Sequence, residues 1–399
     1  MIDISNHPVW KKVSPYKKPF HLLRIHLARQ YAKLFPGSMF IGVTGSVGKT
    51  TTVIACRQVL SQKYKSISTA ETSQLTSNLD PIFNIPMTIL RIAPSVEKVV
   101  LEMGVEYPGD MDINLSFVKP TTVIVTRLSI AHSEFLGGIE DIVREKRKLV
   151  DQLPKNGLAI LNFEDPTSKK LIGENDISVV YFGKDPQNCL VWAGNVKTEN
   201  FRTAFELNHG VERVKVDYQL LGEHQIYPAL AAAALGVVNN IPLTKIKIAL
   251  ESIGPSEHRL QPVSGPNGSV ILDDTYNSSP AAVEAAIDTL LEIPARRRVL
   301  VLGEMRELGE ESEQQHRLIA RKIYREKIDL VFLGQGDAKI ISEELKALGF
   351  LEERLEDNLQ NSHIVSKLLK NLGKGDVCLI KGSRAVRLDE VVKRITKNR

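Results

Sequence analysis

A glycine-rich segment that ends in Gly-Lys-Thr is the strongest chemical signal in the chain. Residues Gly42–Thr52 read GVTGSVGKTTT, follow an apolar run and precede a stretch of helical character over 49–62. In a strand–loop–helix unit, backbone N–H groups and the helix N-terminus bind phosphate, the lysine adds positive charge, and a hydroxyl binds Mg²⁺. Val43 stands where the strict pattern has its first glycine. The context still predicts a loop that binds a nucleoside triphosphate.

Three further polar residues could complete a metal site beside this loop. Glu102 ends one apolar run, His132 follows the next, and Lys146 stands fourteen residues later in helical sequence. Strand ends in an open parallel sheet converge on the ligand crevice, so these side chains could meet there. Each residue also has an ordinary structural explanation: a solvated strand end, a capping residue, and one charge of the run Arg144–Lys148.

The elements that must position these residues form an α/β pattern. Short β-branched runs alternate with helical sequence, which predicts a parallel sheet covered by helices. Alternation around 190–219, with a turn at Asn208-His209-Gly210, predicts a small antiparallel flank. Alanine-rich sequence over 224–239 and residues 243–253 predict two helices. The runs that predict strands of the central sheet are 39–45, 99–104, 121–126 and 158–162.

A second α/β series begins at Val270, after a boundary near 254–258. Its four apolar runs, VILDD, RVLVLG, DLVFLG and DVCLIKG, predict a small Rossmann-like domain. We therefore expect a central P-loop ATPase-type sheet domain with an antiparallel flank, followed by a Rossmann-like domain. The expected divisions are a basic arm and lead-in helix over 1–37, a central domain over 38–255, and a C-terminal domain over 256–399.

Composition excludes several classes of protein. The chain has 399 residues and a net charge of +5, but residues 1–36 alone carry +6 and the remainder −1. A basic body that grips nucleic acid along its length is therefore not expected. There is no apolar run of the roughly 18–20 residues that a spanning helix needs, and no signal-peptide pattern. Three scattered cysteines suit a reducing cytoplasm.

The basic N-terminal segment has two interpretations. Residues 1–19 predict an irregular, solvated arm, and residues 20–35 predict a helix that ends at Pro36-Gly37. The favoured interpretation packs the apolar side of this helix on the next domain. The alternative places a basic helix on an anionic membrane surface. The apolar residues that recur at helical spacing are Phe20, Leu23, Leu27, Tyr31 and Leu34.

Several motifs in a fixed order resemble those of the Mur ligases, the amide-forming ligases of cell-wall peptide assembly. The resemblance covers about 22–399 and is to the MurF branch, the UDP-N-acetylmuramoyl-tripeptide:D-alanyl-D-alanine ligases. The segments that carry it are GVTGSVGKTTT, LEMGVEYPGDM (101–111), TRLSIAHSEFLGGIEDIVREK (126–146), GEHQIYPALAA (222–232), ILDDTYNSSPAAVEAAIDTL (271–290), LGEMRELGEES (302–312) and IKGSRAVRLDEVV (380–392).

The resemblance implies a role for the residues of the phosphate and metal site. Lys49 and Thr50 would hold the ATP phosphates and one of two Mg²⁺ ions, and Glu102 and His132 would bind magnesium in the same cleft. Lys146 matches a lysine that is carbamylated in this superfamily, so that its CO₂ adduct becomes a carboxylate-like metal ligand. The rest of the implied phosphate loop consists of Gly45, Ser46, Gly48 and Thr51.

Further contacts are implied across the gap between the domains. Arg259 would contact the ATP phosphates and Asp274 the ribose. Gln225 stands where the family usually has an asparagine beside the adenine, and its amide offers the same donor and acceptor. The implied substrate-binding residues are Asn78, Thr88 and Asn277.

The acceptor side departs from the family pattern in two ways. In the segment 78–88, Asp80, Pro81 and Asn84 do not match the asparagine-rich acceptor segment. In addition, only 38 residues precede Met39, so the domain that grips the UDP-sugar in MurF enzymes is expected to be absent. The resemblance therefore leaves the acceptor open.

The resemblance implies a cytoplasmic, ATP-dependent carboxylate–amine ligase that works through an acyl phosphate. Its partners would be a small-molecule or peptide acceptor and an amine such as the dipeptide D-Ala-D-Ala. One alternative is a Mur-type ligase with a non-UDP acceptor, such as a pseudomurein-type peptide or a cofactor carboxylate. Another is a nucleotide-binding scaffold without turnover.

Overall fold

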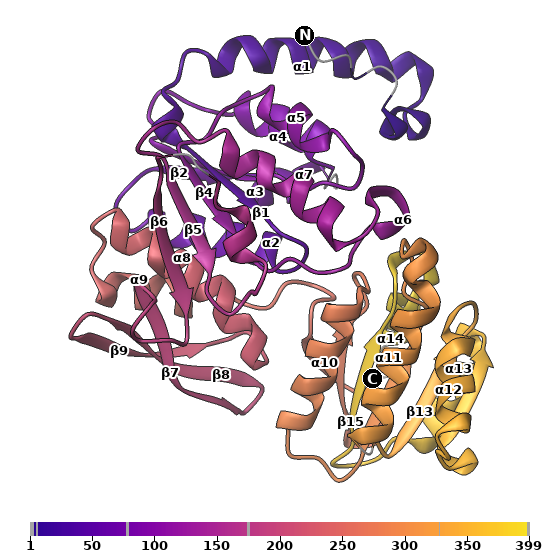
Figure 1. Cartoon of the computed structure of the whole chain (residues 1–399). Coiled ribbons are helices and arrows are strands. Elements are labelled where there is room, and N and C mark those ends of the chain that lie inside the picture. Colours follow the sequence, from indigo (N-terminus) through magenta and orange to yellow (C-terminus); the bar gives the residue numbers. More distant parts are fainter. Residues whose placement is uncertain (1–3, 5–6, 77–79, 174–175, 327, 397–399) are drawn as a thin grey trace.

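Two separate β-sheets organise the chain in the computed structural model (Figure 1). The structure describes residues 4, 7–76, 80–173, 176–326 and 328–396. The first sheet is built from the sequence between residues 40 and 218, and the second from residues 261–381. This division agrees with a domain boundary at 255/256, which stays a prediction.

The first sheet has nine strands in the order β2-β3-β1-β4-β5-β6-β7-β8-β9. Strands β2 to β6 are parallel, whereas β8 runs antiparallel to both β7 and β9. The expected antiparallel flank is confirmed, and it continues the main sheet through the pairing of β6 with β7. The bounds are β1 Phe40–Thr44, β2 Ser66–Ser68, β3 Lys98–Glu102, β4 Thr122–Val125, β5 Leu158–Asn162, β6 Ser178–Gly183, β7 Val191–Glu199, β8 Arg202–His209 and β9 Glu212–Tyr218.

Strands β1 and β5 are buried along almost their whole length, on both faces of the sheet. Such apolar strands must be shielded from water on both faces, and helices cover both. One core joins the sheet to α2, α8 and α9. The buried alanines of α8 let it pack closely against α2. The opposite core joins the sheet to α1, α4, α5 and α7. The bounds are α1 Lys18–Ala32, α2 Lys49–Leu60, α3 Thr69–Thr76, α4 Pro81–Ile89, α5 Asp110–Leu115, α6 Ser133–Leu136, α7 Ile139–Asp151, α8 Ile226–Val238 and α9 Leu243–Glu251.

The second sheet has six strands in the order β10-β11-β15-β12-β13-β14, and all but β10 are parallel. Helices α10, α11 and α12 pack on one face, and α13 and α14 pack on the other. The predicted Rossmann-like arrangement is confirmed, while the edge strands β10 and β14 were not predicted. The bounds are β10 Gln261–Ser264, β11 Val270–Asp274, β12 Arg298–Leu302, β13 Leu330–Gly334, β14 Leu355–Leu359, β15 Val377–Lys381, α10 Pro280–Glu292, α11 Ser312–Arg325, α12 Ala338–Ala347, α13 Asn361–Asn371 and α14 Leu388–Thr396.

The N-terminal arm packs against the central domain, so the expectation of a solvated arm was wrong. It forms two short 3₁₀ helices, Pro8–Lys12 and Pro15–Lys17. Trp10 is only 3% exposed and meets the ring of Phe83 in α4 edge-on, with the ring centroids 5.5 Å apart. The reason is that the arm carries apolar side chains, which complete the core above α4.

Helix α1 is present as expected, but the side of the helix that is buried is not the one that was predicted. Its small or branched residues Ile25, Ala28 and Ala32 face inward, and the helix packs on α4. Of the predicted apolar face, only Tyr31 packs against the core, and its hydroxyl donates to the carbonyl of Ile92 at 2.8 Å. The rest of that face is solvent-exposed, with Phe20 at 70% and Leu34 at 73%. Small side chains allow the helix to lie close to the apolar surface of α4, which explains why this narrower side is buried.

No helix within the described ranges combines the length and apolar character that crossing a bilayer would require.

Candidate active site

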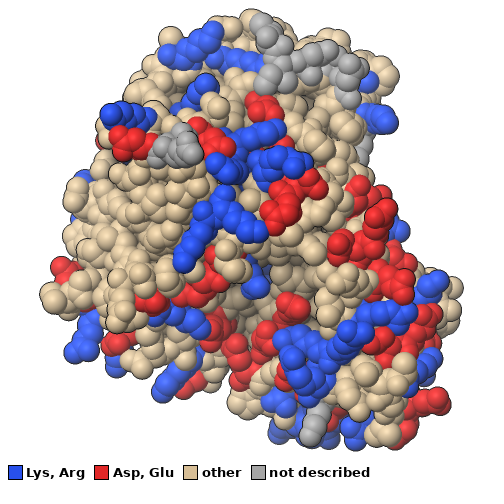
Figure 2. All heavy atoms as spheres, viewed as in Figure 1, with Lys and Arg blue, Asp and Glu red and all other residues tan. Residues whose placement is uncertain are grey.

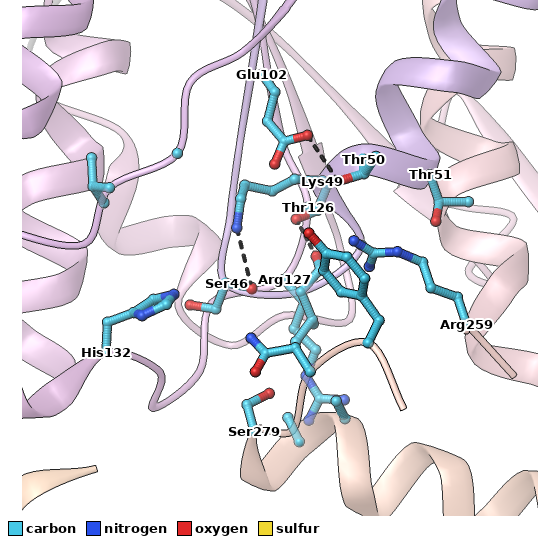
Figure 3. A pocket seen from close by; sticks show the side chains of 18 of the residues that line it. Ser46, Lys49, Thr50, Thr51, Glu102, Thr126, Arg127, His132, Arg259 and Ser279 are labelled. Atoms are coloured by element: carbon cyan, nitrogen blue, oxygen red, sulfur yellow. Dashed lines mark hydrogen bonds between the residues drawn. The ribbon is translucent and has the colours of Figure 1, made fainter. Parts of the chain in front are cut away.

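A cavity of about 780 Å³ lies between the two sheet domains. One wall consists of the end of β3 and the segments that follow β1 and β4. The other wall consists of the segment after β11 and the start of α10. Figure 3 shows Lys49, Arg259 and His132 reaching toward this space from different elements. Most residues that the sequence singled out therefore meet in one place.

The glycine-rich loop has the shape that a phosphate site requires. Gly45 has φ +145°, and a Cβ atom there would collide with the Oγ1 atom of Thr126. The hydroxyl of Ser46 donates to the carbonyl of Ser129 (2.8 Å) and accepts the N–H of the same residue (3.0 Å). Gly48, at φ +80°, begins helix α2. The loop is thus tied to the segment after β4, and its N–H groups sit at a helix N-terminus.

Lys49 extends along this loop into the cavity, and its ammonium donates to the carbonyl of Ser46 at 3.4 Å. Burial lowers the pKa of Lys49, and the nearby carboxylate of Glu102 opposes that shift. A lysine that has lost part of its hydration without a short salt bridge is ready to bind a phosphate oxygen.

Thr50 and Glu102 offer adjacent oxygen ligands. The hydroxyl of Thr50 donates to Oε2 of Glu102 at 2.9 Å, at the point where α2 begins and β3 ends. Magnesium prefers oxygen ligands and keeps several from water and substrate phosphates. In the described parts of the chain, no three His, Cys, Asp or Glu side chains gather as a metal cluster. The residues present therefore fit magnesium that is held jointly with a nucleotide.

His132 lines the cavity but points to the other domain. Its Nδ1 atom lies 2.7 Å from Oε2 of Glu307, a residue that follows β12. The adjacent residues reinforce this contact: the hydroxyl of Ser133 donates to the carbonyl of Leu308 (2.9 Å), and the N–H of Glu134 donates to the carbonyl of Glu307 (3.1 Å). We name these contacts of residues 132–134 with 307–308 the domain clasp. A metal-ligand role for His132 stays a prediction.

Lys146 lies in α7, behind the cavity wall rather than on it. Its side chain is buried, and within the described ranges it has no hydrogen bond or ion pair. Burial lowers its pKa well below the ordinary value, and the positive charge of Lys49 acts in the same direction. Asp110 and Glu145 oppose the shift without cancelling it. Burial therefore favours the neutral form of this amine.

The C-terminal domain contributes an arginine and a carboxylate to the opposite wall. The guanidinium of Arg259 stacks on the ring of Tyr276 at 4.0 Å from its centroid. Asp274 accepts the N–H of Leu260 on Oδ1 (3.1 Å) and the ammonium of Lys381 on Oδ2 (2.6 Å). Both Arg259 and Asp274 line the cavity, as expected.

Lys381 was not found from the sequence, although a signal existed. It ends the strand DVCLIKG, and β15 pairs with β11 so that Lys381 lies opposite Asp274. Its ammonium also donates to the carbonyl of Asn277 at 2.8 Å. Asn277 lines the cavity, and Lys381 fixes the turn that presents it.

Uncharged side chains line the cavity where α8 faces α10. Gln225 and Pro228 lie at the start of α8, and Ala282 belongs to α10 of the other domain. Burial lowers the pKa of the neighbouring His224 to about 4, so its imidazole is neutral at physiological pH. Apolar walls with an amide and a neutral imidazole supply stacking surface and hydrogen bonds without charge.

The side of the cavity that the resemblance gives to the acceptor contains residues that the sequence did not predict. His7 and Val13 of the N-terminal arm line it together with Asp80. Nε2 of His7 lies 2.6 Å from Oδ1 of Asp110, and burial raises the pKa of Asp80 to about 6. His7 and Asp110 are 103 positions apart, so no local pattern could have paired them.

Besides Lys146, three predicted residues do not line the cavity or fall outside the described ranges. Thr88 is buried in α4, where its hydroxyl contacts Thr72 and the carbonyl of Asn84, both at 2.9 Å. Gly45 shapes the loop without lining the cavity. Asn78 lies outside the described residues. The other predicted loop residues, Ser46, Gly48 and Thr51, line the cavity.

Comparison with known proteins agrees with this architecture. Residues 43–236 match the Mur ligase middle domain, and residues 258–384 match the Mur ligase glutamate ligase domain. The UDP-N-acetylmuramoyl-tripeptide–D-alanyl-D-alanine ligase of Escherichia coli is 31% identical over 363 residues, which cover 90% of this chain and 77% of that protein. The enzyme of the same name from Bacillus subtilis is 29% identical, with 92% and 78% covered.

Solved structures share the fold. MurF from Acinetobacter baumannii superposes with a TM-score of 0.84 at 23% identity, covering 95% of this chain and 81% of that one. MurF from Thermotoga maritima in complex with ADP gives 0.81 at 25% identity, with 94% and 83% covered. A pseudomurein peptide ligase type C from Methanothermus fervidus gives 0.70 at 17% identity, covering 96% and 85%.

The two-domain fold with a phosphate loop at the domain gap defines an ATP-dependent ligase of the type that joins an acid to an amino acid. The chain belongs to the Mur ligase family.

Proposed function

We propose that this enzyme joins the carboxylate of a cell-wall peptide precursor to the amine of a dipeptide such as D-Ala-D-Ala, as the relatives' names describe. The observation that carries the proposal is the cavity itself. It holds a phosphate loop with Lys49, Thr50 and Glu102 on one wall, and Arg259 on the other. The proposed reaction takes place in the cytoplasm, where ATP is available.

In the proposed reaction, a carboxylate oxygen of the acceptor bonds to the γ-phosphorus of ATP while the bond to ADP breaks. The amine then attacks the acyl carbon, loses a proton, and phosphate departs as the amide forms. Lys49 and Arg259 neutralise charge on the phosphoryl oxygens from opposite walls. Closure of the two domains excludes water, which would otherwise hydrolyse the acyl phosphate.

Bound magnesium would supply further positive charge beside the phosphates. Thr50 and Glu102 fit as ligands because their oxygens already lie together at 2.9 Å. We assign His132 a contact at the second of two metal positions, by family resemblance.

We propose that Lys146 is carbamylated, and two of its properties support this. A buried lysine with a lowered pKa retains the free electron pair that attacks CO₂. The product has a new N–C bond, releases one proton, and carries two carboxylate-like oxygens. Such oxygens suit a hard cation, whereas an unmodified ammonium would repel it.

The remaining assignments concern substrate orientation. By family resemblance, we assign Gln225 to the adenine, Asp274 to the ribose and Asn277 to the substrate. The position of all three on the cavity wall supports these assignments. Thr88 is buried behind the acceptor side. Its hydrogen bonds support a role in holding α4 in place rather than a direct contact.

A second candidate function differs only in the acceptor. The arm residues His7 and Val13 and the α4 cap Asp80 line the side of the cavity that the resemblance gives to the acceptor. Asp80 also departs from the family pattern. These observations favour a carboxylate acceptor other than a UDP-linked peptide, bound by the arm.

The experiment is an assay of ADP release by the purified chain with ATP, Mg²⁺ and D-Ala-D-Ala. UDP-linked tripeptide, the same peptide without UDP, and buffer alone are compared as acceptors. Release that requires both acceptor and dipeptide supports ligation, and the preferred acceptor decides between the two candidates. Lys49→Ala serves as the inactive control. ADP release that never depends on acceptor or amine would contradict the proposal and favour a scaffold without turnover.

A further inference from the structure

The outward side of α1 is a row of large apolar residues in solvent. Phe20, Leu23 and Leu27 recur at spacings of three and four, and therefore lie on one side of the helix, away from the buried residues of α1. Leu34 follows just beyond the end of the helix, and Tyr31, between Leu27 and Leu34, is half-buried. Leu27, the least exposed of the four leucine and phenylalanine residues, still exposes 49% of its surface. We call this row the outer stripe, and its members are Phe20, Leu23, Leu27 and Leu34.

Within the described residues, α1 and the turn that follows it present more exposed large apolar side chains than any other helix or strand. Single exposed apolar residues are normal, whereas a contiguous row marks an interaction site. In Figure 1, α1 forms the outer edge of the central domain, and nothing in the described chain covers its outward side. A ligand for the stripe must come from outside the described chain.

Positive charge surrounds the stripe. Residues 1–36 hold seven Lys or Arg and one acid, Asp3, which lies outside the described residues. Figure 2 shows blue Lys and Arg side chains at both ends of α1, at the top of the molecule. Lys17 and Lys33 are exposed, whereas Arg29 turns inward, donating to the hydroxyl of Ser116 at 2.7 Å and stacking over Phe117.

We infer that α1 docks on an anionic lipid bilayer, with the outer stripe in the interfacial region and the basic residues against the headgroups. A helix with leucine and phenylalanine on one side and lysine and arginine around it has the composition that lies in such an interface. A second copy of the chain is a poorer partner for this surface, because a symmetric contact would bring like charges together. A bilayer supplies both the apolar layer and the opposite charge.

The arm that precedes α1 in the chain contributes His7 and Val13 to the cavity wall. The inference does not depend on the proposed reaction, because binding is measured without ATP or acceptor.

The experiment is sedimentation of the full chain with vesicles of phosphatidylcholine, with or without phosphatidylglycerol. We expect binding only to the vesicles that contain phosphatidylglycerol, and weaker binding in added salt. Leu23→Ser with Leu27→Ser should reduce partitioning on the order of tenfold or more, because two buried apolar groups are lost. The matched control is Leu318→Ser with Leu351→Ser, two leucines of similar exposure in the C-terminal domain.

Two charge-reversal variants distinguish docking through α1 from a general electrostatic attraction of the whole protein to the vesicles. Lys17→Glu with Lys33→Glu should abolish binding, whereas Lys197→Glu with Lys215→Glu, on the exposed strands β7 and β9, should retain it at the same net charge. Urea unfolding establishes that each variant is folded. Failure of the full chain to bind phosphatidylglycerol vesicles would overturn the inference, as would equal loss in both charge variants. If the full chain forms a dimer but does not bind vesicles, and if the Leu23→Ser, Leu27→Ser variant loses that dimer, the stripe is an interface with a second copy instead.

Discussion

The buried ion pair between Lys381 and Asp274 leads to a quantitative stability prediction for the C-terminal domain. Both residues end paired strands, and their charged atoms lie 2.6 Å apart with only 2% and 12% of the side chains exposed. Lys381→Met nearly preserves the length of the side chain but removes its charge. The carboxylate of Asp274 then stays buried without its cation.

Removing one member of a buried pair costs about 3–5 kcal/mol, because the remaining charge is uncompensated. With a urea slope of roughly 2 kcal/mol per molar, the midpoint falls by about 2 M. Adding Asp274→Asn removes the stranded charge and keeps Oδ1 as the acceptor for the N–H of Leu260. We therefore expect the double variant to recover more than half of the loss.

The assay is urea unfolding followed by circular dichroism, since both tryptophans, Trp10 and Trp192, lie outside the C-terminal domain. Lys346→Met is the matched control. This lysine is 50% exposed, forms a surface ion pair with Asp357, and should cost at most about 1 kcal/mol. Equal midpoints for the Lys381 and Lys346 variants would refute the reasoning, as would a double variant no more stable than Lys381→Met alone.

Four further predictions concern the site. Lys49→Ala should lower ATP turnover by about 100-fold or more without unfolding the protein, because a phosphate contact is lost; near-normal ADP release would contradict its role. Arg259→Ala should raise the KM for ATP, and unchanged kinetics would remove this residue from the site. Lys146→Ala should lose most activity, and Lys146→Arg should not restore it. Acetate at fixed ionic strength should partly rescue the alanine variant. Wild-type rates for the arginine variant would exclude carbamylation. Burial lowers the pKa of His224 in the folded protein from 6.5 to about 4, so the unfolded chain binds a proton at this imidazole first as the pH falls. The free energy of unfolding therefore decreases from about pH 6.5 toward pH 4. The difference between the urea midpoints at about pH 7 and pH 5 should be smaller in His224→Gln than in the wild type.

The parts of the fold that depend on local sequence were predictable. Strands β5 and β11 begin and end at the predicted residues, because compact apolar runs bounded by polar residues leave little freedom. The phosphate loop was equally clear, since its glycines and lysine are contiguous. Arg259 and Asp274 were placed by family resemblance, and the structure brings both to the cavity.

The parts that depend on distant contacts were not predictable. Helix α1 has two apolar sides, and only the surface of α4 decides which one is buried. The contact of His7 with Asp110 joins segments far apart in sequence. The position of Lys381 depends on the order of strands in the second sheet, which no periodicity encodes.

The domain clasp has a mechanical consequence. The chain passes between the domains over 252–260, and the contacts of His132, Ser133 and Glu134 with the loop after β12 form a second attachment. Two further contacts also join the domains: the hydroxyl of Thr198 in β7 with Glu292 of α10, and the hydroxyl of Thr289 in α10 with Nδ1 of His224, at 3.4 Å. The linker, the clasp and these contacts together hold the C-terminal domain in one orientation, with Arg259 at the cavity wall. An opening that separates the two walls of the cavity therefore first requires the clasp and these two contacts to break.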